Sequence, residues 1–222
     1  MVTLYITRHG QTEWNIQQRI QGWFDSPLTA HGQKQSMALC KRLSRTPFIA
    51  AYSSPSGRAL DTAKFILDGH QTPLFIKPGI KEINVAEWQG MTLPAITEKY
   101  PEQYDHYFHH PEQFRSEEGE NFYDVLERAQ KVIESIITKY DEDDNVLIVT
   151  HSVVKHVLIN AFANKTMEHL WDAPSIEGTS LTIVRYEKGT YTIQTIGDVE
   201  HLPEDLPLCS KMATKKEKDG CL

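Results

Sequence analysis

Short apolar runs alternate with amphipathic stretches along the first three quarters of the chain. The runs at 49–52 and 146–149 are apolar throughout, the run at 2–7 is apolar except for Thr3 and Thr7, and all three have the length of buried strands. Between them, the stretches at 29–43 and 122–137 place apolar residues three and four positions apart, which is the spacing of an amphipathic helix. Strands that alternate with helices form a mostly parallel sheet with helices on both faces, so the pattern predicts a three-layer α/β/α sandwich.

Two parts of the chain depart from this alternation. A weak third strand at 75–76 is followed by an irregular section at 78–117, dense in proline, histidine and aromatic residues, which we expect to leave the core and cap the site. Near the other end, two β-rich runs at 180–186 and 191–196 flank the turn Glu187-Lys188-Gly189-Thr190 and predict a hairpin. The predicted fold class is therefore α/β, with a mostly parallel central sheet and one antiparallel strand.

The length of 222 residues suits one large core. We interpret residues 1–208 as a single domain, with the cap insert at about 78–117. Residues 209–222 are polar and rich in lysine, and we expect them to form a flexible C-terminal tail.

Composition narrows the partners and the cellular location. The formal net charge of −7 argues against a surface built to bind nucleic acid. No apolar run approaches the roughly 20 residues that span a bilayer, and the first residues do not resemble a secretion signal, so we expect no membrane contact and a cytoplasmic location. The widely spaced cysteines Cys40, Cys209 and Cys221 are expected to be plain thiols. The sequence leaves open whether the protein is a homodimer.

Two histidines and two arginines follow the ends of predicted strands. His9 and His151 come directly after strands, Arg8 precedes His9, and Arg58 lies in the loop region after a third strand. Ligands of parallel sheets bind beyond these carboxyl ends, and arginine forks with helix N-terminal N–H groups bind tetrahedral oxyanions, so the residues predict a phosphate site. A single histidine after a strand is usually a structural or loop residue, so one histidine alone would not indicate a phosphate site. The prediction depends on two histidines and two arginines occurring together. The chain has no Gly-x-x-x-x-Gly-Lys loop and no aspartate cluster with metal-ligand spacing, so we expect neither a cofactor nor a metal.

The residues around these groups form an ordered series of motifs. In chain order these are Thr7-Arg8-His9-Gly10-Gln11-Thr12-Glu13-Trp14-Asn15, Gln21-Gly22-Trp23, Leu28-Thr29-x-x-Gly32, Ser53-Ser54-Pro55-Ser56-Gly57-Arg58-Ala59-x-x-Thr62-Ala63, Glu82 before Trp88-Gln89-Gly90, Glu118-Gly119-Glu120, and Val149-Thr150-His151. The series runs from about Thr3 to Thr182 and closely resembles the phosphoglycerate-mutase-like branch of the histidine phosphatase superfamily.

The resemblance implies a role for each matching residue. His9 corresponds to the nucleophile that takes the phosphoryl group, Arg8 and Arg58 to clamps on its oxygens, and His151 to the imidazole that stabilises the group in transfer. Glu82 corresponds to the general acid that protonates the leaving oxygen and then activates water. The expected substrate-binding residues are Asn15, Gln21, Gly22 and Ser152.

Four positions bear on how closely the chain matches the family. Glu87 is a rival for the general acid, and we prefer Glu82 because the family's acid stands eight residues before the glycine that is Gly90 here. Ser152 occupies a position that is usually glycine in the family, which keeps the backbone N–H and adds a hydroxyl. Asn84 and Ala86 replace residues that are often histidine and glycine in relatives.

The core motifs do not separate a phosphatase from a mutase, because both form a phosphohistidine. The segment 92–117 is mostly neutral or acidic, and Arg115 with Lys99 gives it few partners for a second phosphate or carboxylate. We therefore expect a metal-independent phosphomonoesterase that hydrolyses small phosphorylated metabolites through a phosphohistidine at His9. The alternatives are a phosphoglycerate mutase that needs a bisphosphate primer and a non-catalytic sensor of a phosphorylated ligand.

The cap section contains two groups that could bind something else. Its aromatic residues could cover an organic leaving group, although such residues more often only pack an excursion onto the core. His106, His109 and His110 could hold a metal, but a solvated cap surface is the better interpretation.

Overall fold

The computed structural model describes residues 1–140 and 143–203. The expected C-terminal tail at 209–222, with Cys209 and Cys221, lies outside the described residues. Cys40 is a free thiol, as predicted. No helix within the described ranges has the length and the apolar character needed to cross a bilayer.

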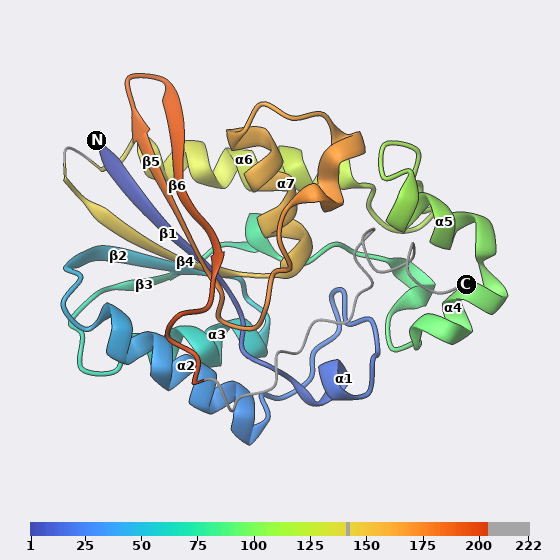
Figure 1. Cartoon of the computed structure of the whole chain (residues 1–222), viewed down its shortest axis with the longest axis horizontal. Helices are drawn as coiled ribbons and strands as arrows, with labels where there is room; N and C mark the ends of the chain where they lie inside the picture. The colour runs from blue at the N-terminus through green and yellow to red at the C-terminus, as the bar shows by residue number, and fades with distance from the viewer. Residues whose placement is uncertain (141–142, 204–222) are drawn as a thin grey trace.

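A six-stranded sheet in the order β3-β2-β4-β1-β5-β6 forms the centre of the molecule (Figure 1). Its strands are β1 (Val2–Arg8), β2 (Phe48–Ser53), β3 (Leu74–Ile76), β4 (Asn145–Thr150), β5 (Leu181–Glu187) and β6 (Thr190–Asp198). β1, β2, β3 and β4 are parallel, whereas β5 pairs antiparallel with both β1 and β6. The predicted mostly parallel sheet, its hairpin and its single antiparallel strand are confirmed.

Helices cover both faces of the sheet, which confirms the predicted three layers. In Figure 1, α2 and α3 lie on one side of the sheet, and α6 and α7 lie on the other. The helices are α1 (Glu13–Ile16), α2 (Ala30–Leu43), α3 (Gly57–Ile66), α4 (Leu93–Lys99), α5 (Pro101–His109), α6 (Phe122–Ile137) and α7 (Ser152–Phe162), with short 3-10 helices η1 (Pro78–Ile80), η2 (Ala86–Trp88) and η3 (Met167–Asp172).

The central strand β4 divides the apolar core into two clusters. Val146 and Ile148 face the cluster formed with α6 and α7, while Leu147 and Val149 face the cluster formed with α2 and α3. Because successive side chains of a strand point to opposite faces, a strand covered on both faces must be apolar at every position. This is why β4 is a continuous apolar run rather than an alternating one.

The section that the sequence predicts as irregular contains two helices, α4 and α5, beside η1 and η2. α4 buries Ile96 alone, whereas Tyr104, Tyr107 and Phe108 of α5 stand three and four positions apart and pack against the core, which is a helical spacing that we did not predict. Both helices carry a proline in their first turn, where a missing N–H is tolerated. The prediction of an irregular section without helices is therefore wrong. The predicted excursion between β3 and α6 is present, and it packs Ile96 and Tyr107 into the same cluster as α6 and α7.

Two loops at the C-terminal end of the sheet approach each other closely. A side chain on Gly32, near the start of α2, would collide with the backbone oxygen of Gln11 in the loop after β1. The Thr29 hydroxyl accepts a hydrogen bond from the Gly32 N–H and so caps the same helix. The motif Leu28-Thr29-x-x-Gly32 thus fixes the loop that follows β1, where His9 lies.

We expect Ile148→Ala to lower the free energy of unfolding by about 2–5 kcal/mol, because the substitution leaves a cavity in the two-sided core. Ile148 is fully buried, whereas Ile49 on β2 is 48% exposed. Ile49→Ala is the matched control, and we expect it to change the free energy of unfolding by less than about 1 kcal/mol. Urea denaturation followed by circular dichroism measures both, and equal losses would contradict the assignment of β4 to the centre of the core.

Candidate functional site

Three parallel strands bring the predicted site residues to one edge of the sheet. β1 and β2 both pair with β4, in a register that sets Arg8 opposite Thr150 and Ser53 opposite Val149. The strands therefore end at one level, and the residues that follow them meet there. These are His9 after β1, Ser54 after β2, and His151 after β4.

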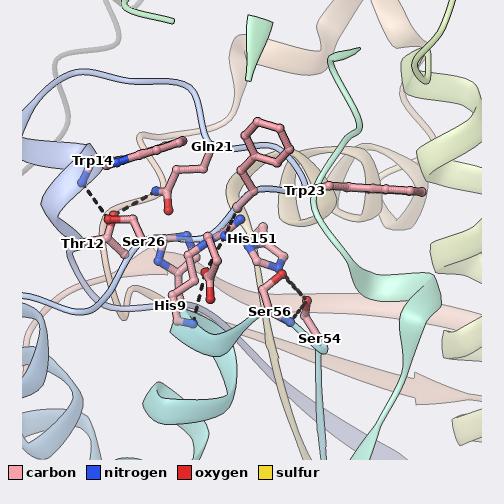
Figure 2. A network of polar contacts seen from close by, with 12 residues as sticks. His9, Thr12, Trp14, Gln21, Trp23, Ser26, Ser54, Ser56 and His151 are labelled. Carbon is pink, nitrogen blue, oxygen red and sulfur yellow. Dashed lines mark hydrogen bonds and ion pairs between the residues drawn. The ribbon is translucent and has the colours of Figure 1, made fainter. Parts of the chain in front are cut away.

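The two histidines face each other in a buried position (Figure 2). Their ring centroids are 5.2 Å apart with an interplanar angle of 62°. His9 Nδ1 lies 2.8 Å from the Gly10 carbonyl oxygen. A carbonyl only accepts, so Nδ1 carries the hydrogen of the neutral ring and Nε2 carries the lone pair. Nε2 is thus the atom of His9 that can act as a nucleophile.

Burial and positive charge keep both histidines neutral. Burial lowers the pKa of His9 well below its usual value, and the charges of Arg58 and Arg8 lower it further. Burial likewise lowers the pKa of His151, and the charge of Arg58 adds to the shift. A neutral imidazole is a nucleophile and a protonated one is not, so the environment favours the reactive form of His9.

Arg58 is held by the backbone of the loop that precedes α2. Its Nη1 donates to the Phe24 carbonyl at 2.7 Å and to the Asp25 carboxylate at 2.9 Å, and its Nη2 donates to the Gly22 carbonyl at 2.9 Å. Gly22 has a φ of +54°, and a side chain there would collide with Gln89. The predicted substrate-binding residue Gly22 therefore lies against Arg58 and offers it a carbonyl oxygen.

Seven buried side-chain atoms of the described residues have no hydrogen-bond partner, and four of them belong to predicted site residues. The four atoms are Arg8 Nε, Arg58 Nε, His151 Nδ1 and Gln21 Oε1. Such an unpaired atom costs about 1–3 kcal/mol, so a concentration of them at one place indicates a ligand that pairs with them. The two guanidinium N–H groups are suited to an anion.

Glu82 lies against the first turn of α7. Its carboxylate accepts hydrogen bonds from the Ile83 N–H at 2.9 Å and from the Val153 N–H at 3.4 Å. Burial raises the pKa of Glu82 above its usual value, and these hydrogen bonds and the charge of Arg58 offset only part of that rise. A carboxyl group that holds its proton more strongly is suited to act as a general acid. The rival Glu87 is exposed instead and lines a separate surface pocket.

The remaining predicted binding residues lie around the loop after β1. Thr12 joins two of them, because its Oγ1 accepts from Gln21 Nε2 at 2.9 Å and donates to Asn15 Oδ1 at 3.0 Å. Asn15 also closes a capping box at α1, so only its Nδ2 remains for a ligand. Ser152 is the first residue of α7, immediately after His151.

Several residues that support the site were not predicted from the sequence. Ser54 Oγ lies 2.7 Å from His151 Nε2 and orients that ring. Arg128, on α6, donates to the Glu82 carbonyl at 3.0 Å and pairs with Glu120 at 2.7 Å. Trp23 Nε1 donates to the same Glu82 carbonyl at 2.8 Å. Ser54, Trp23 and Glu120 belong to the motifs quoted above, so the motifs could have indicated them. Arg128 lies on the polar side of a helix, and no motif or spacing in the sequence connects it with the site.

A pocket of about 450 Å³ opens beside the segment that follows Glu82. Its walls include Val85, Trp88, Phe114, Arg115, Glu117 and Glu118. Arg115 is tied to the carbonyls of Glu112 and Phe114. The lining thus has the mostly neutral or acidic character that the sequence indicates.

The cap histidines pair with acidic neighbours. His109 Nδ1 lies 2.7 Å from Asp105 within α5, and His110 lies 3.9 Å from Glu112. Among the residues with described positions, no group of three or more histidine, cysteine, aspartate or glutamate side chains is placed to hold a metal ion.

Comparison with known proteins gives one family over nearly the whole chain. The model of the histidine phosphatase superfamily, branch 1, matches residues 4–199. A metal-independent phosphoserine phosphatase of Arabidopsis thaliana is 31% identical over 202 residues, which is 90% of this chain and 82% of the relative. A probable phosphoglycerate mutase GpmB of Escherichia fergusonii is 26% identical over 213 residues, with 91% and 95% covered.

The fold agrees with a solved structure as well. The structure of YhfR from Bacillus stearothermophilus superposes with a TM-score of 0.88 at 41% identity, covering 90% of this chain and 99% of that one. The resemblance that the motifs predict is confirmed, as is the class of enzyme that it implied, a hydrolase of phosphoric monoesters. With a family model that spans the strands and loops that build the site, we conclude that this chain belongs to the histidine phosphatase superfamily, branch 1.

Proposed function

We propose that this protein hydrolyses small phosphorylated metabolites without a metal, in two steps, through a phosphohistidine at His9. One observation carries the proposal. The free Nε2 of His9 lies in a buried site whose arginine Nε atoms and His151 Nδ1 have no partner among the described residues. A nucleophile surrounded by unpaired donors is what the transfer of an anionic phosphoryl group requires.

In the first step, His9 Nε2 attacks the phosphorus atom and the bond from phosphorus to the ester oxygen breaks. The proton of the Glu82 carboxyl group goes to that oxygen, so the organic product leaves as an alcohol. Arg8 and Arg58 neutralise the charge on the three remaining oxygens, the neutral His151 donates a hydrogen bond to them, and the N–H groups at the start of α7 add to this field.

In the second step, the Glu82 carboxylate accepts a proton from a water molecule whose oxygen attacks the phosphorus atom. The bond between phosphorus and Nε2 breaks, and inorganic phosphate forms. The lone pair returns to Nε2 and the proton returns to Glu82, so both groups are ready for the next cycle.

The charges of the section between Glu82 and α6 favour hydrolysis over a mutase reaction. A mutase must hold an acid with further anionic groups, which needs cations beyond those that bind the phosphoryl group. In the pocket of about 450 Å³, the cation Arg115 stands beside Glu87, Glu117 and Glu118. The names of relatives include both phosphoserine phosphatases and probable phosphoglycerate mutases, and phosphoserine is accordingly the first substrate to test.

We expect His9→Ala to abolish phosphate release from p-nitrophenyl phosphate, because no other group can take the phosphoryl group. In the wild type, rapid quenching into base after addition of the substrate should trap one phosphorus per chain on His9. Phosphate release that survives His9→Ala would remove the phosphohistidine from the mechanism. Absence of turnover in the wild type would favour a sensor of phosphorylated ligands.

The same preparation separates hydrolysis from mutase activity. With 3-phosphoglycerate and a bisphosphate primer, we expect inorganic phosphate and no 2-phosphoglycerate in a coupled assay. Appearance of the isomer would identify a mutase. We also expect EDTA to leave the rate of hydrolysis unchanged. A loss of activity on addition of EDTA would contradict the metal-independent mechanism.

We expect Glu82→Gln to lower kcat/KM for an alkyl phosphate by about 10²–10⁴-fold, because the poor leaving group needs a proton. The loss should be much smaller for p-nitrophenyl phosphate, whose leaving group departs as an anion. Glu87→Gln is the matched control, and it should stay within threefold of the wild type on both substrates. Equal losses on the two substrates, or a larger effect at Glu87, would rule out Glu82 as the acid.

The pKa shifts predict the direction of the pH dependence. His9 must be neutral, and its pKa is lowered, so the acid limb of kcat/KM should lie below the ordinary histidine value of about 6.5. Glu82 must be protonated, and its pKa is raised, so the alkaline limb should lie above 4.5 and disappear in Glu82→Gln. The profile is measured with an alkyl phosphate and corrected for the second ionisation of the substrate. An acid limb centred at or above pH 6.5 would contradict a neutral, buried His9.

A further inference from the structure

A lysine on α7 is buried beside the site and is not used in the mechanism above. Lys155 is 1% exposed, and its Nζ donates to the Ser180 carbonyl at 2.7 Å and to the Ser180 hydroxyl at 3.3 Å. Within the described residues, no carboxylate forms an ion pair with it. Burying a lysine amine with only neutral partners disfavours its charged form and is unfavourable for folding, so its position calls for another explanation.

The loop that Lys155 contacts is the loop that holds Arg8. The Ile176 carbonyl accepts a hydrogen bond from Arg8 Nη1 at 2.8 Å, and the Thr179 N–H donates to the Arg8 carbonyl at 3.1 Å. Ser180, the partner of Lys155, directly follows Thr179. The segment 176–180 thus contacts the clamp arginine at both its backbone and its guanidinium group.

This loop is strained and depends on its neighbours. Thr179 has a φ of +59°, a conformation that β-branched residues rarely adopt and that persists only when the surrounding contacts enforce it. The Ser180 N–H closes a turn onto the Glu177 carbonyl at 3.1 Å. The two bonds from Lys155 hold the residue next to the strained position.

Lys155 also belongs to the helix that presents His151. It lies one turn after His151, and its backbone N–H donates to the His151 carbonyl at 3.1 Å. Its side chain therefore joins the helix of the second imidazole to the loop of the first arginine. The charge of Arg8 contributes to lowering the pKa of Lys155, which agrees with the closeness of the two groups, although burial is the larger cause.

We propose that Lys155 is a positioning residue, which fixes the loop 176–180 through Ser180 and thereby aims the guanidinium group of Arg8 at the phosphoryl oxygens. The proposal rests on the proposed phosphatase function. If Lys155 acts only through Arg8, its loss should matter only while Arg8 is present.

A double-mutant cycle tests this dependence, with p-nitrophenyl phosphate as substrate. We expect Lys155→Met to lower kcat/KM by about tenfold or more, mainly through kcat, and Arg8→Ala to lower it by roughly 100-fold or more. The double variant should stay within twofold of Arg8→Ala alone. A double variant with the two losses multiplied, or a Lys155→Met enzyme within twofold of the wild type, would overturn the proposal.

His156→Leu is the matched control for a change in the stability of α7. His156 is also buried, but it packs against Trp171 at 4.9 Å instead of binding the loop 176–180. We expect it to change the melting temperature while kcat/KM at a temperature well below melting stays within threefold. A loss equal to that of Lys155→Met would assign the effect to the helix as a whole.

A second variant keeps the test decisive if Lys155→Met does not fold. Ser180→Ala removes the hydroxyl that accepts the second hydrogen bond of Lys155 without changing α7. We expect it to lower kcat severalfold and to add nothing to Arg8→Ala, and an unchanged kcat would overturn the proposal. The His9→Ala control separates a failure of the proposed function from a failure of the positioning role. Activity that survives His9→Ala refutes the proposed function, whereas activity lost there but insensitive to Lys155 and Ser180 refutes only the positioning role.

Discussion

The in-register parallel pairing of β1 and β2 with β4 is the constraint on which the site depends. Because Arg8 lies opposite Thr150 and Ser53 opposite Val149, three loops far apart in the sequence begin at the same level. A slip of one residue in either pairing would turn the side chains of a whole strand to the other face and shift the level at which the following loop begins. The register of these pairings therefore fixes the relative positions of His9, Ser54 and His151.

Burial shifts the pKa values of His9 and Glu82 in opposite directions. Removing water disfavours the charged form of every group, so it lowers the pKa of His9 and raises that of Glu82. The result is a neutral imidazole in the same site as a carboxyl group that holds its proton more strongly. The nearby arginines add to the shift at His9 and oppose the shift at Glu82. For Glu82, burial is the larger effect, because the net shift of its pKa is upward.

The elements and residues that the sequence predicts share a local signal. The strands are short apolar runs, and His9 and His151 directly follow two of them, so the parallel topology alone places these residues together. In contrast, the apolar signal of the two cap helices is short, because α4 buries only Ile96 and the helical spacing of Tyr104, Tyr107 and Phe108 in α5 covers little more than one turn. Their helical structure depends on packing against residues distant in the sequence, such as Trp171 beside Tyr107.

The groups that hold the candidate site residues in place were not predicted, for a different reason. Arg58 is held by the carbonyls of Gly22 and Phe24, and Arg8 by the carbonyl of Ile176. Every residue has a carbonyl group, so a backbone contact of this kind leaves little trace in the residue types. Arg128 reaches the Glu82 carbonyl across 46 positions, and no periodicity connects the two residues.

The residues of the candidate phosphate site and the pocket of about 450 Å³ lie in different parts of the chain. The former follow β1, β2 and β4 and are fixed by the core, whereas the pocket begins at Val85 and extends to Glu118 in the excursion after β3. A change in the residues that line the pocket therefore leaves the strand pairing that places His9 undisturbed. The relatives named above include both a phosphatase and a probable mutase, and a section that is independent of the strand pairing is where two such proteins can differ while they keep the same sheet.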